Sequence, residues 1–317
     1  MQETVNNTSV TLHPSSFQRR VKMYWKHRSL FLLFLPALLY YLFFKYLPMY
    51  GVQIAFKKYI FLKGIWGSPW VKFDNFEKLL HLHSFWEVLR NTFIISGLKL
   101  LFGFPAPIIL ALLLNEIRTV WFKRTVQTIS YLPHFLSWVI LSGIFIQFLS
   151  PSIGPVNIAI KAMGGKPIYF LGSEKWFRSV LVATHVWKSV GWATIVYLAA
   201  LTSINPEFYE AAYIDGANRW QCTRFITIPS LAPVITIMLI FAIGGIIDDD
   251  FSQIYNMYNE AVYSVGDVIS TFTYRRGLVK MDYSFASAVD LFKNLVALVL
   301  IISTNAIAKR VNDYGIW

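Results

Sequence analysis

The sequence predicts an all-α membrane protein with six transmembrane helices. Of its 317 residues, 56% are hydrophobic and only 15% are charged, whereas soluble domains carry about 25% charged residues. Aromatic residues make up 17% of the chain, which suits belts of Trp and Tyr at membrane interfaces. In addition, six separate stretches are long and apolar enough to cross the hydrocarbon core, which takes about 20 residues.

The six stretches follow one another along the chain with polar loops between them. They cover roughly residues 29–47, 92–114, 126–148, 179–203, 233–250 and 287–308. The third and fourth contain Ser, Thr and Gly, which favour contacts between helices over contacts with lipid. The fourth also carries polar and large aromatic side chains, namely His185, Trp187, Lys188, Trp192 and Tyr197.

A basic segment, residues 1–28, precedes the first stretch. A secretory signal peptide has the same order, but this chain continues after Phe44 as Lys45-Tyr46-Leu47-Pro48, without a small-residue cleavage site. We therefore expect a retained first helix, a cytoplasmic N-terminal segment (1–28) and a transmembrane domain (29–317). Six spans place both termini on one side, and the basic N-terminal segment favours the cytoplasm for both.

In this topology the loops 115–125 and 204–232 are cytoplasmic, and the second has the signals of a short helix. Asn205 suits an N-cap, and Pro206 at the first helical position loses no hydrogen bond. Glu207 and Glu210 lie in the first turn, where the helix dipole favours negative charge. Gly216 permits the positive φ that ends a helix. We expect a short helix, a turn and a second helical stretch, although an ordinary amphipathic connector has the same signals.

The same loop resembles a family motif. Glu210-Ala211-Ala212, three residues, Gly216, nine residues and Ile226-Thr227-Ile228-Pro229 are similar to the EAA loop of binding-protein-dependent ABC importer permeases, with Ile228 where the family has Leu. The resemblance implies a type I importer permease whose loop at 204–232 is a coupling helix for an ATPase subunit. The residues implied in this contact are Glu207, Glu210, Ala211, Ala212, Asp215 and Gly216.

A longer resemblance points to the substrate. The extended motif Glu-Ala-Ala-Tyr-Ile-Asp-Gly-Ala resembles the sugar-importing branch, and Leu47-Pro48-Met49-Tyr50-Gly51 resembles permeases for alginate and pectin-derived fragments. It implies import of an oligosaccharide or polysaccharide fragment through a bacterial plasma membrane. The implied partners are ATPase subunits, a second homologous permease, a substrate-binding protein and membrane lipid. Asp290 stands where Gly is expected, a departure from the pattern.

The motifs that the sequence lacks narrow the chemistry. Gly164-Gly165-Lys166-Pro167 does not match a phosphate-binding loop, so we expect ATP and Mg²⁺ on the partner ATPase subunits and no cofactor or metal on this chain. Cys222 is the sole cysteine, which excludes an intrachain disulfide. We expect a transport subunit and not an enzyme. The net charge of +12 is better explained by residues that flank membrane spans than by nucleic-acid binding.

Four aromatic residues are candidates for a substrate pathway, because aromatic faces stack on the C–H faces of sugars. They are Trp187, Trp192, Tyr197 and Tyr255. Anchoring at the membrane interface and packing between helices are the more frequent reasons for such residues. Asp248–Asp250 and Arg275-Arg276 are expected near the outer mouth, where charges could contact a binding protein.

Two other functions stay open at this point. The same machine could carry a non-sugar solute such as an amino acid. An ion-driven secondary transporter is a different class, and it would show inverted repeats and carboxylates in mid-membrane. Neither is evident in the sequence.

Overall fold

The computed structural model of the chain describes residues 27–247 and 249–312. By their contacts the residues divide into two units, Met1–Gln53 and Ile54–Trp317. The predicted basic N-terminal segment lies outside the described residues, except for His27 and Arg28. Among the described residues the only β-pairing is one bridge between Lys57 and Trp70, so the predicted all-α class is confirmed.

The first unit is one helical run. It starts with α2 (Arg28–Tyr41) and continues through a π-helical turn, Leu42–Tyr46, into a 3₁₀ segment, Leu47–Phe56. The run is 29 residues long with a mean hydropathy of 1.9. No side chain of α2 is buried, as expected for a helix that faces lipid or a partner chain.

The second unit carries the remaining helices. In chain order they are 3₁₀ Phe61–Lys63, α3 Gly64–Gly67, α4 Asp74–His81, α5 His83–Gly103, α6 Pro105–Glu116, α7 Val120–Tyr131, 3₁₀ Leu132–Phe135, α8 Trp138–Phe148, α9 Pro155–Ala162, α10 Glu174–Thr202, α11 Glu207–Ile214, α12 Arg219–Cys222, π-turn Thr223–Thr227, α13 Ile228–Gly244, α14 Phe251–Met257, 3₁₀ Glu260–Val262, α15 Tyr263–Gly266, α16 Ile269–Tyr274, π-turn Arg275–Val279 and α17 Tyr283–Asn312.

Four helical runs among the described residues are long and apolar enough to span a membrane. They are Arg28–Phe56, His83–Glu116, Arg219–Gly244 and Tyr283–Arg310. They correspond to the first, second, fifth and sixth predicted stretches. The fifth begins earlier than predicted, because Pro229 lies in the first turn of α13 and does not interrupt the helix. It ends at Gly244.

The third predicted stretch, 126–148, is present as a bent pair of helices. Val120–Phe135 and Trp138–Phe148 meet at 104°. Leu136 is extended, and the Ser137 side chain accepts a hydrogen bond from Ile140 N as the cap of α8. The bend therefore coincides with a new helix start.

The fourth predicted stretch is the single helix α10, 29 residues long, or about 44 Å at 1.5 Å per residue. It is long enough to cross a membrane but less apolar than the other spans, since His185 and Lys188 lie in its middle. With α10 and the bent pair, the described residues contain six helical regions at the predicted places, consistent with six spans.

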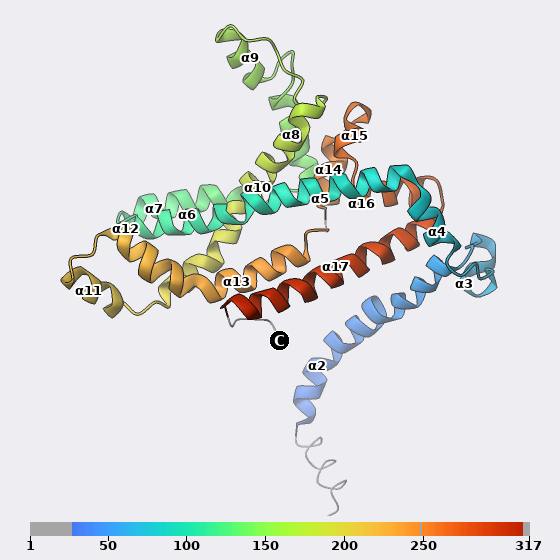
Figure 1. The fold of residues 1–317 in the computed structure, drawn as a ribbon, viewed down its shortest axis with the longest axis horizontal. Helices are drawn as coiled ribbons and strands as arrows, with labels where there is room; N and C mark the ends of the chain where they lie inside the picture. The colour runs from blue at the N-terminus through green and yellow to red at the C-terminus, as the bar shows by residue number, and fades with distance from the viewer. Residues whose placement is uncertain (1–26, 248, 313–317) are drawn as a thin grey trace, which may run out of the picture. The chain divides into compact units, whose positions relative to one another are not determined.

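The core of the second unit forms around α10, which packs against α5, α6 and α7, while α13 packs against α17 (Figure 1). Buried apolar side chains such as Ile95, Phe177, Leu181 and Ile254 join α5 and α10 to α14. Only 22% of the most apolar window of α13 is buried. Most apolar side chains there are therefore available to lipid or partner chains.

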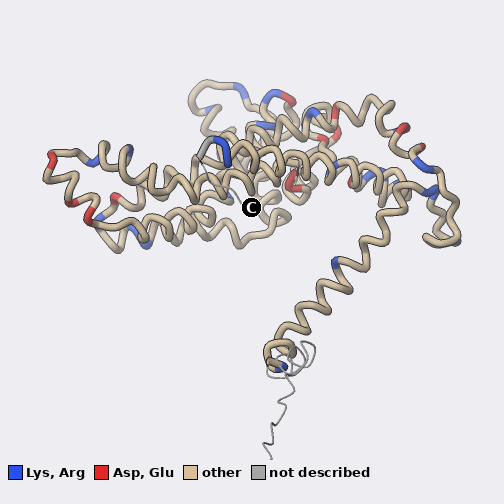
Figure 2. The backbone as a smooth tube through the Cα atoms, turned by 60° about the horizontal axis from the view of Figure 1, so that its bottom comes forward, with Lys and Arg blue, Asp and Glu red and all other residues tan. Residues whose placement is uncertain are grey.

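Charged residues gather at the ends and turns of the helices. Figure 2 shows long uncharged runs between these ends, and acidic residues clustered at the end of the unit that carries α11. Such a distribution fits helices whose middle parts lie in hydrocarbon, where ionised side chains are costly.

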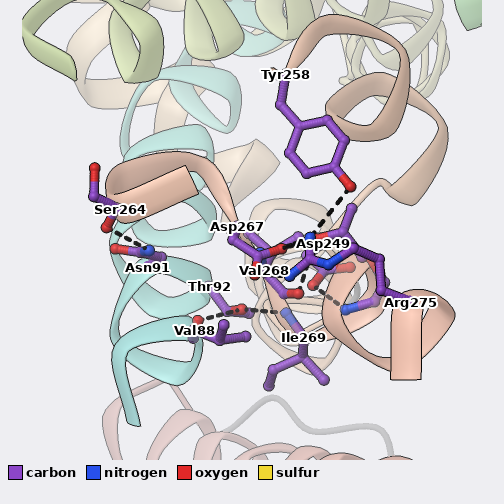
Figure 3. Close-up of polar contacts among 12 residues, drawn as sticks. Val88, Asn91, Thr92, Asp249, Tyr258, Ser264, Asp267, Val268, Ile269 and Arg275 are labelled. Carbon is purple, nitrogen blue, oxygen red and sulfur yellow. Dashed lines mark hydrogen bonds and ion pairs between the residues drawn. The ribbon is translucent and has the colours of Figure 1, made fainter. Parts of the chain in front are cut away.

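The segment between α14 and α17 is tied to α5 by polar contacts (Figure 3). Thr92 Oγ1 accepts a hydrogen bond from Ile269 N at 2.9 Å, and Asn91 Nδ2 donates to Ser264 O at 2.9 Å. Arg275 donates to both carboxylate oxygens of Asp267. These contacts hold α15 and α16 in a defined place beside α5.

Candidate functional site

The loop with the family motif is an ordered projection. Helix α11 begins at Glu207, one residue later than predicted, with Pro206 as its N-cap residue. Asn205 Oδ1 accepts a hydrogen bond from Glu207 N at 3.1 Å, and its amide donates to the Glu207 carboxylate. Glu207 and Glu210 both lie in the first turn, where the unpaired backbone N–H groups favour negative charge.

The projection turns at Gly216, as predicted. This residue has φ +81°, and Ala217 N donates to Ala212 O across the helix end. Such a left-handed residue closes a helix, and glycine adopts it without steric cost. The next helix, α12, then starts at a capping box in which Asn218 and Gln221 bond each other's backbone N–H groups. The turn is thereby fixed on both sides.

Two contacts fasten the projection to the helices behind it. The hydroxyl groups of Tyr209 and Thr227 lie 2.9 Å apart. Arg219 Nη1 lies 3.1 Å from Glu116 Oε2 at the end of α6. As Figure 1 shows, α11, α12 and the α6–α7 turn lie together at one end of the second unit. The two loops that the sequence assigned to one side of the membrane are therefore neighbours.

The surface of the projection is exposed and partly apolar. The predicted coupling residues Glu207, Glu210, Ala211, Asp215 and Gly216 are exposed, and Ala212 is half-buried. Ile214 is 87% exposed, and Phe208, Tyr213 and Trp220 are each more than half exposed. Apolar side chains exposed on a rigid loop with an acidic rim form a surface suited to a protein partner.

A cavity of about 450 Å³ lies between α5, α10 and α13. On α10 it is lined by His185, Ser189, Ala193 and Tyr197, which are spaced by one helical turn and so share one face. On α5 it is lined by Lys99, whose Nζ lies 3.6 Å from Asp250 Oδ2.

The charged groups of this cavity neutralise one another. Asp250 Oδ2 also lies 3.2 Å from His185 Nδ1, so one carboxylate joins α5 and α10. Asp250 reaches this position with φ +43°, a left-handed conformation that Asp tolerates better than most residues. Asp249 and Asp250 are therefore engaged by partners within the unit, and their place near the outer mouth stays a prediction. Asp249 is 2% exposed and accepts from Ser270 N, and Asp248 lies outside the described residues.

The four predicted pathway residues do not share one site. Tyr197 is 3% exposed and lines the cavity between α5, α10 and α13. Trp187 packs on Phe145, and Trp192 stacks on His134 at 4.6 Å, so both face the bent pair of α7 and α8. Tyr255 belongs to α14 and stacks on Phe251 at 5.0 Å. Arg275, expected at the mouth, is bound to Asp267.

The sequence allowed Lys99 to pair with a carboxylate but did not identify Asp250 as the partner, and it did not single out Ser189. A lysine in the middle of an apolar stretch was the available signal, because a buried charge requires a partner. The partner, Asp250, is 151 positions away along the chain. The pairing therefore cannot be inferred from the residues around Lys99.

Fold and loop together define a multi-pass helical membrane protein with an ordered, exposed projection. Residues 103–313 match the family described as binding-protein-dependent transport system inner membrane component. The chain belongs to this family and is a permease subunit of an ABC importer. It is a transport component and not an enzyme, and the ion-driven alternative is set aside.

Three known proteins are similar to this chain over most of its length. Protein LplB of Bacillus subtilis is 44% identical over 92% of both chains. The polygalacturonan/rhamnogalacturonan transport system permease protein YteP of Bacillus subtilis is 40% identical, over 92% of this chain and 91% of that protein. A crystal structure of the bacterial alginate ABC transporter in complex with alginate pentasaccharide-bound periplasmic protein contains a chain with 41% identity and a TM-score of 0.86, covering 93% of this chain and 99% of that one.

Proposed function

We propose that this permease imports an oligosaccharide or polysaccharide fragment handed over by an extracytoplasmic binding protein. The support is the similarity at 40–41% identity to permeases whose names specify polygalacturonan, rhamnogalacturonan and alginate. Trp187, Trp192, Tyr197 and Tyr255 are the aromatic groups that we assign to the sugar's path. Tyr197 reaches a cavity, and the other three lie on partly exposed faces that a second permease subunit would cover.

The α11 projection is the part of this chain that the ATPase subunit binds. The carrying observation is its combination of rigidity and exposure: hydrogen bonds at Asn205 and in the capping box of α12 fix the loop, yet Ile214 is 87% exposed. Glu207, Glu210, Ala211, Ala212, Asp215 and Gly216 make or shape the contact. ATP and Mg²⁺ bind to the ATPase subunits, so this chain contributes motion of its helices and no chemistry.

The proposed topology places both termini, and the α11 projection, in the cytoplasm. It is supported by the structure's grouping of the α6–α7 turn with α11 and α12 at one end (Figure 1). The loop that carries α9 and the segment of α14 to α16 then face outward, where a binding protein docks.

The docking role is tested with Ile214→Glu, which places a charge at the most exposed apolar position of the projection. We expect the ATPase subunit to be lost from the purified complex. Met163→Glu is the matched control, since Met163 is 79% exposed in the loop after α9 and should leave the complex intact. Full retention of the ATPase subunit by Ile214→Glu would contradict the docking role.

The substrate is tested by ATPase activity of the reconstituted importer with its binding protein. Neutral oligosaccharides, uronate oligosaccharides and amino acids are compared at equal concentrations. Stimulation by either saccharide class supports the proposal. Stimulation by amino acids alone overturns it in favour of the non-sugar alternative.

A further inference from the structure

A second cavity, which we call the α16–α17 cavity, shares no lining residue with the cavity between α5, α10 and α13. It has a volume of about 470 Å³, within the range of small-molecule sites, about 300–1,000 Å³. Its walls come from α14, α16 and the first turns of α17. In Figure 1 this part of α17 lies at the end of the second unit opposite to α11. With the proposed topology, it therefore faces the outer side.

The lining combines aromatic faces with oxygen atoms. Phe251, Tyr274 and Tyr283 supply the rings. Ser287 and Asp290, one turn apart on α17, supply a hydroxyl and an exposed carboxylate. Aromatic walls with a few convergent polar groups are the usual composition of a small-molecule site. Rings stack on the C–H faces of a sugar, and carboxylate and hydroxyl oxygens accept hydrogen bonds from its hydroxyl groups.

An aromatic row leads to this cavity. It consists of Tyr263, Tyr258, Tyr255, Tyr274 and Phe251. Successive ring centroids lie 5.0, 6.0, 5.0 and 5.3 Å apart, within the 4.5–7 Å of packed aromatic pairs. At the end of the row farthest from the cavity, Arg275 Cζ lies 4.8 Å from the centroid of the Tyr263 ring. The row ends in two residues of the cavity wall, so it continues the site as a strip on which further sugar rings can lie.

The backbone holds the cavity open in a fixed shape. A Cβ on Gly277 would meet Ala286 Cβ at 2.6 Å, so the turn after α16 touches α17 directly. Tyr283 packs edge-on against Tyr59 at 5.8 Å, and the next residue, Ser284, accepts from Tyr59 N at 2.8 Å. The walls are thus positioned before any ligand arrives, which lowers the entropy cost of binding.

Charge selects the class of ligand. Asp290 is the one ionisable carboxylate among the residues that line the cavity, and its charged neighbours, Lys293 and Asp249, have opposite signs. Asp290 is the one charged residue of the lining, and no basic side chain among the described residues lines the cavity, so a uronate carboxylate there meets a like charge without a partner. We propose that the α16–α17 cavity binds one neutral sugar ring of the saccharide that this permease imports. This inference rests on the proposed function and adds a subsite to it.

Direct occupancy is tested in the complete importer, in lipid nanodiscs. Cys222 is the sole cysteine and is buried, so Ser287→Cys on a Cys222→Ser background gives one reactive thiol. Saturating neutral trisaccharides of glucose, mannose or galactose should slow its thiosulfonate labelling about tenfold at ten times the half-saturating concentration. Trigalacturonate at equal concentration should protect less. Ser150→Cys, in a different cavity, is the control and should keep its labelling rate.

Two variants test the roles of the walls. Tyr274→Leu should raise the half-saturating concentration of the neutral saccharide about tenfold, the size of one lost stacking contact. Tyr274→Phe keeps the ring face and should behave as wild type. Tyr169→Leu removes an exposed tyrosine elsewhere and should have no effect. Asp290→Asn should narrow the difference between neutral and uronate saccharides.

The outcomes separate the inference from the proposed function. Saccharide-stimulated ATPase activity without protection of Ser287→Cys overturns the subsite alone. Equal protection by trigalacturonate and the neutral trisaccharides overturns the selectivity for a neutral ring. Absence of any saccharide response in the wild-type importer overturns both.

Discussion

At the scale of single residues, buried polar side chains fix the loops of this protein. Asn157 is fully buried, its Nδ2 lies within 3.1 Å of the carbonyl oxygens of Leu149, Ser150 and Ile168, and its Oδ1 accepts from Ile168 N at 2.7 Å. One amide thus satisfies backbone groups on both sides of α9. Buried backbone groups require such partners wherever helices end.

Replacement of Asn157 should loosen this loop. Asn157→Ala leaves several carbonyl groups and one N–H without partners, and each costs about 1–3 kcal/mol if it stays buried. We expect faster tryptic cleavage after Lys161 in detergent-solubilised protein. Asn256→Ala removes an exposed bond to Ser252 O and should leave the cleavage rate unchanged. Equal rates for Asn157→Ala and wild type would show that the amide does not hold the loop.

Arg275 fastens the segment after α15. Burial alone would lower the pKa of Arg275, but its bonds to Asp267 raise it above the ordinary value. Burial raises the pKa of Tyr258 to about 12, so its hydroxyl stays protonated and accepts from Arg275 Nη1 at 3.3 Å. The guanidinium thereby serves two partners at once.

A lysine cannot reproduce this geometry, because its single ammonium lacks the planar fork of arginine. Arg275→Lys should lower the unfolding free energy by about 1.5–3 kcal/mol, the usual contribution of hydrogen bonds to charged groups. Thermal unfolding of the purified complex measures this loss of stability. Lys280→Arg is the control, at an exposed basic position nearby. An unchanged midpoint for Arg275→Lys would refute the fastening role.

At the scale of elements, the α11 projection shows how a short helix becomes rigid. A helix of eight residues is unstable alone, yet hydrogen bonds at Asn205 and Ala217 fix the turns at the two ends of α11, and Tyr209 bonds Thr227. Gly216 is essential to its turn because φ +81° is strained for other residues. Nothing lies within 4 Å of a Cβ added there, so a substitution would act through the backbone alone.

This isolates the effect of backbone strain on coupling. Gly216→Ala costs roughly 1–2 kcal/mol in the left-handed region and should shift the turn, which lowers transport per ATP hydrolysed. Gly216→Asn tolerates this region better and should retain more coupling. Gly164 offers a matched control, since it also has φ +81° and open space. Gly164→Ala should leave coupling intact, and an equal loss in both alanine variants would contradict a role specific to α11.

At the scale of the whole molecule, the arrangement of loops predicts a single topology. The projection of α11 and the loop of α9 belong to opposite sides of the membrane in our proposal. Each has an exposed apolar residue at its tip, Ile214 and Met163. Because Cys222 is buried, introduced cysteines at these two places report the sides directly.

Cysteine labelling in intact cells and inverted vesicles tests this topology. On a Cys222→Ser background, a membrane-impermeant maleimide should label Met163→Cys in intact cells and Ile214→Cys only in inverted vesicles. Permeabilised cells, in which both should react, are the control. Labelling of Ile214→Cys in intact cells would place the projection outside and would falsify the proposed contact with the ATPase.

The sequence determined the elements, since it specifies them through local chemistry. Apolar length located the spans, and capping residues with Gly216 located the α11 turn to within one residue. The spacing of the motif around Glu210 indicated the family, which the match over residues 103–313 confirmed. Each of these signals is contained within a few turns of chain.

The tertiary structure alone decided which residues meet. The pairing of Lys99 with Asp250 joins positions 151 apart, and the α16–α17 cavity combines Phe251 with Asp290 across three helices. Helical periodicity places a side chain on a face, but the partner of that face depends on how the helices cross. The 104° bend before α8 likewise depends on how the helices pack together. Local signals specify each segment, and packing between segments remote in the chain specifies the cavities.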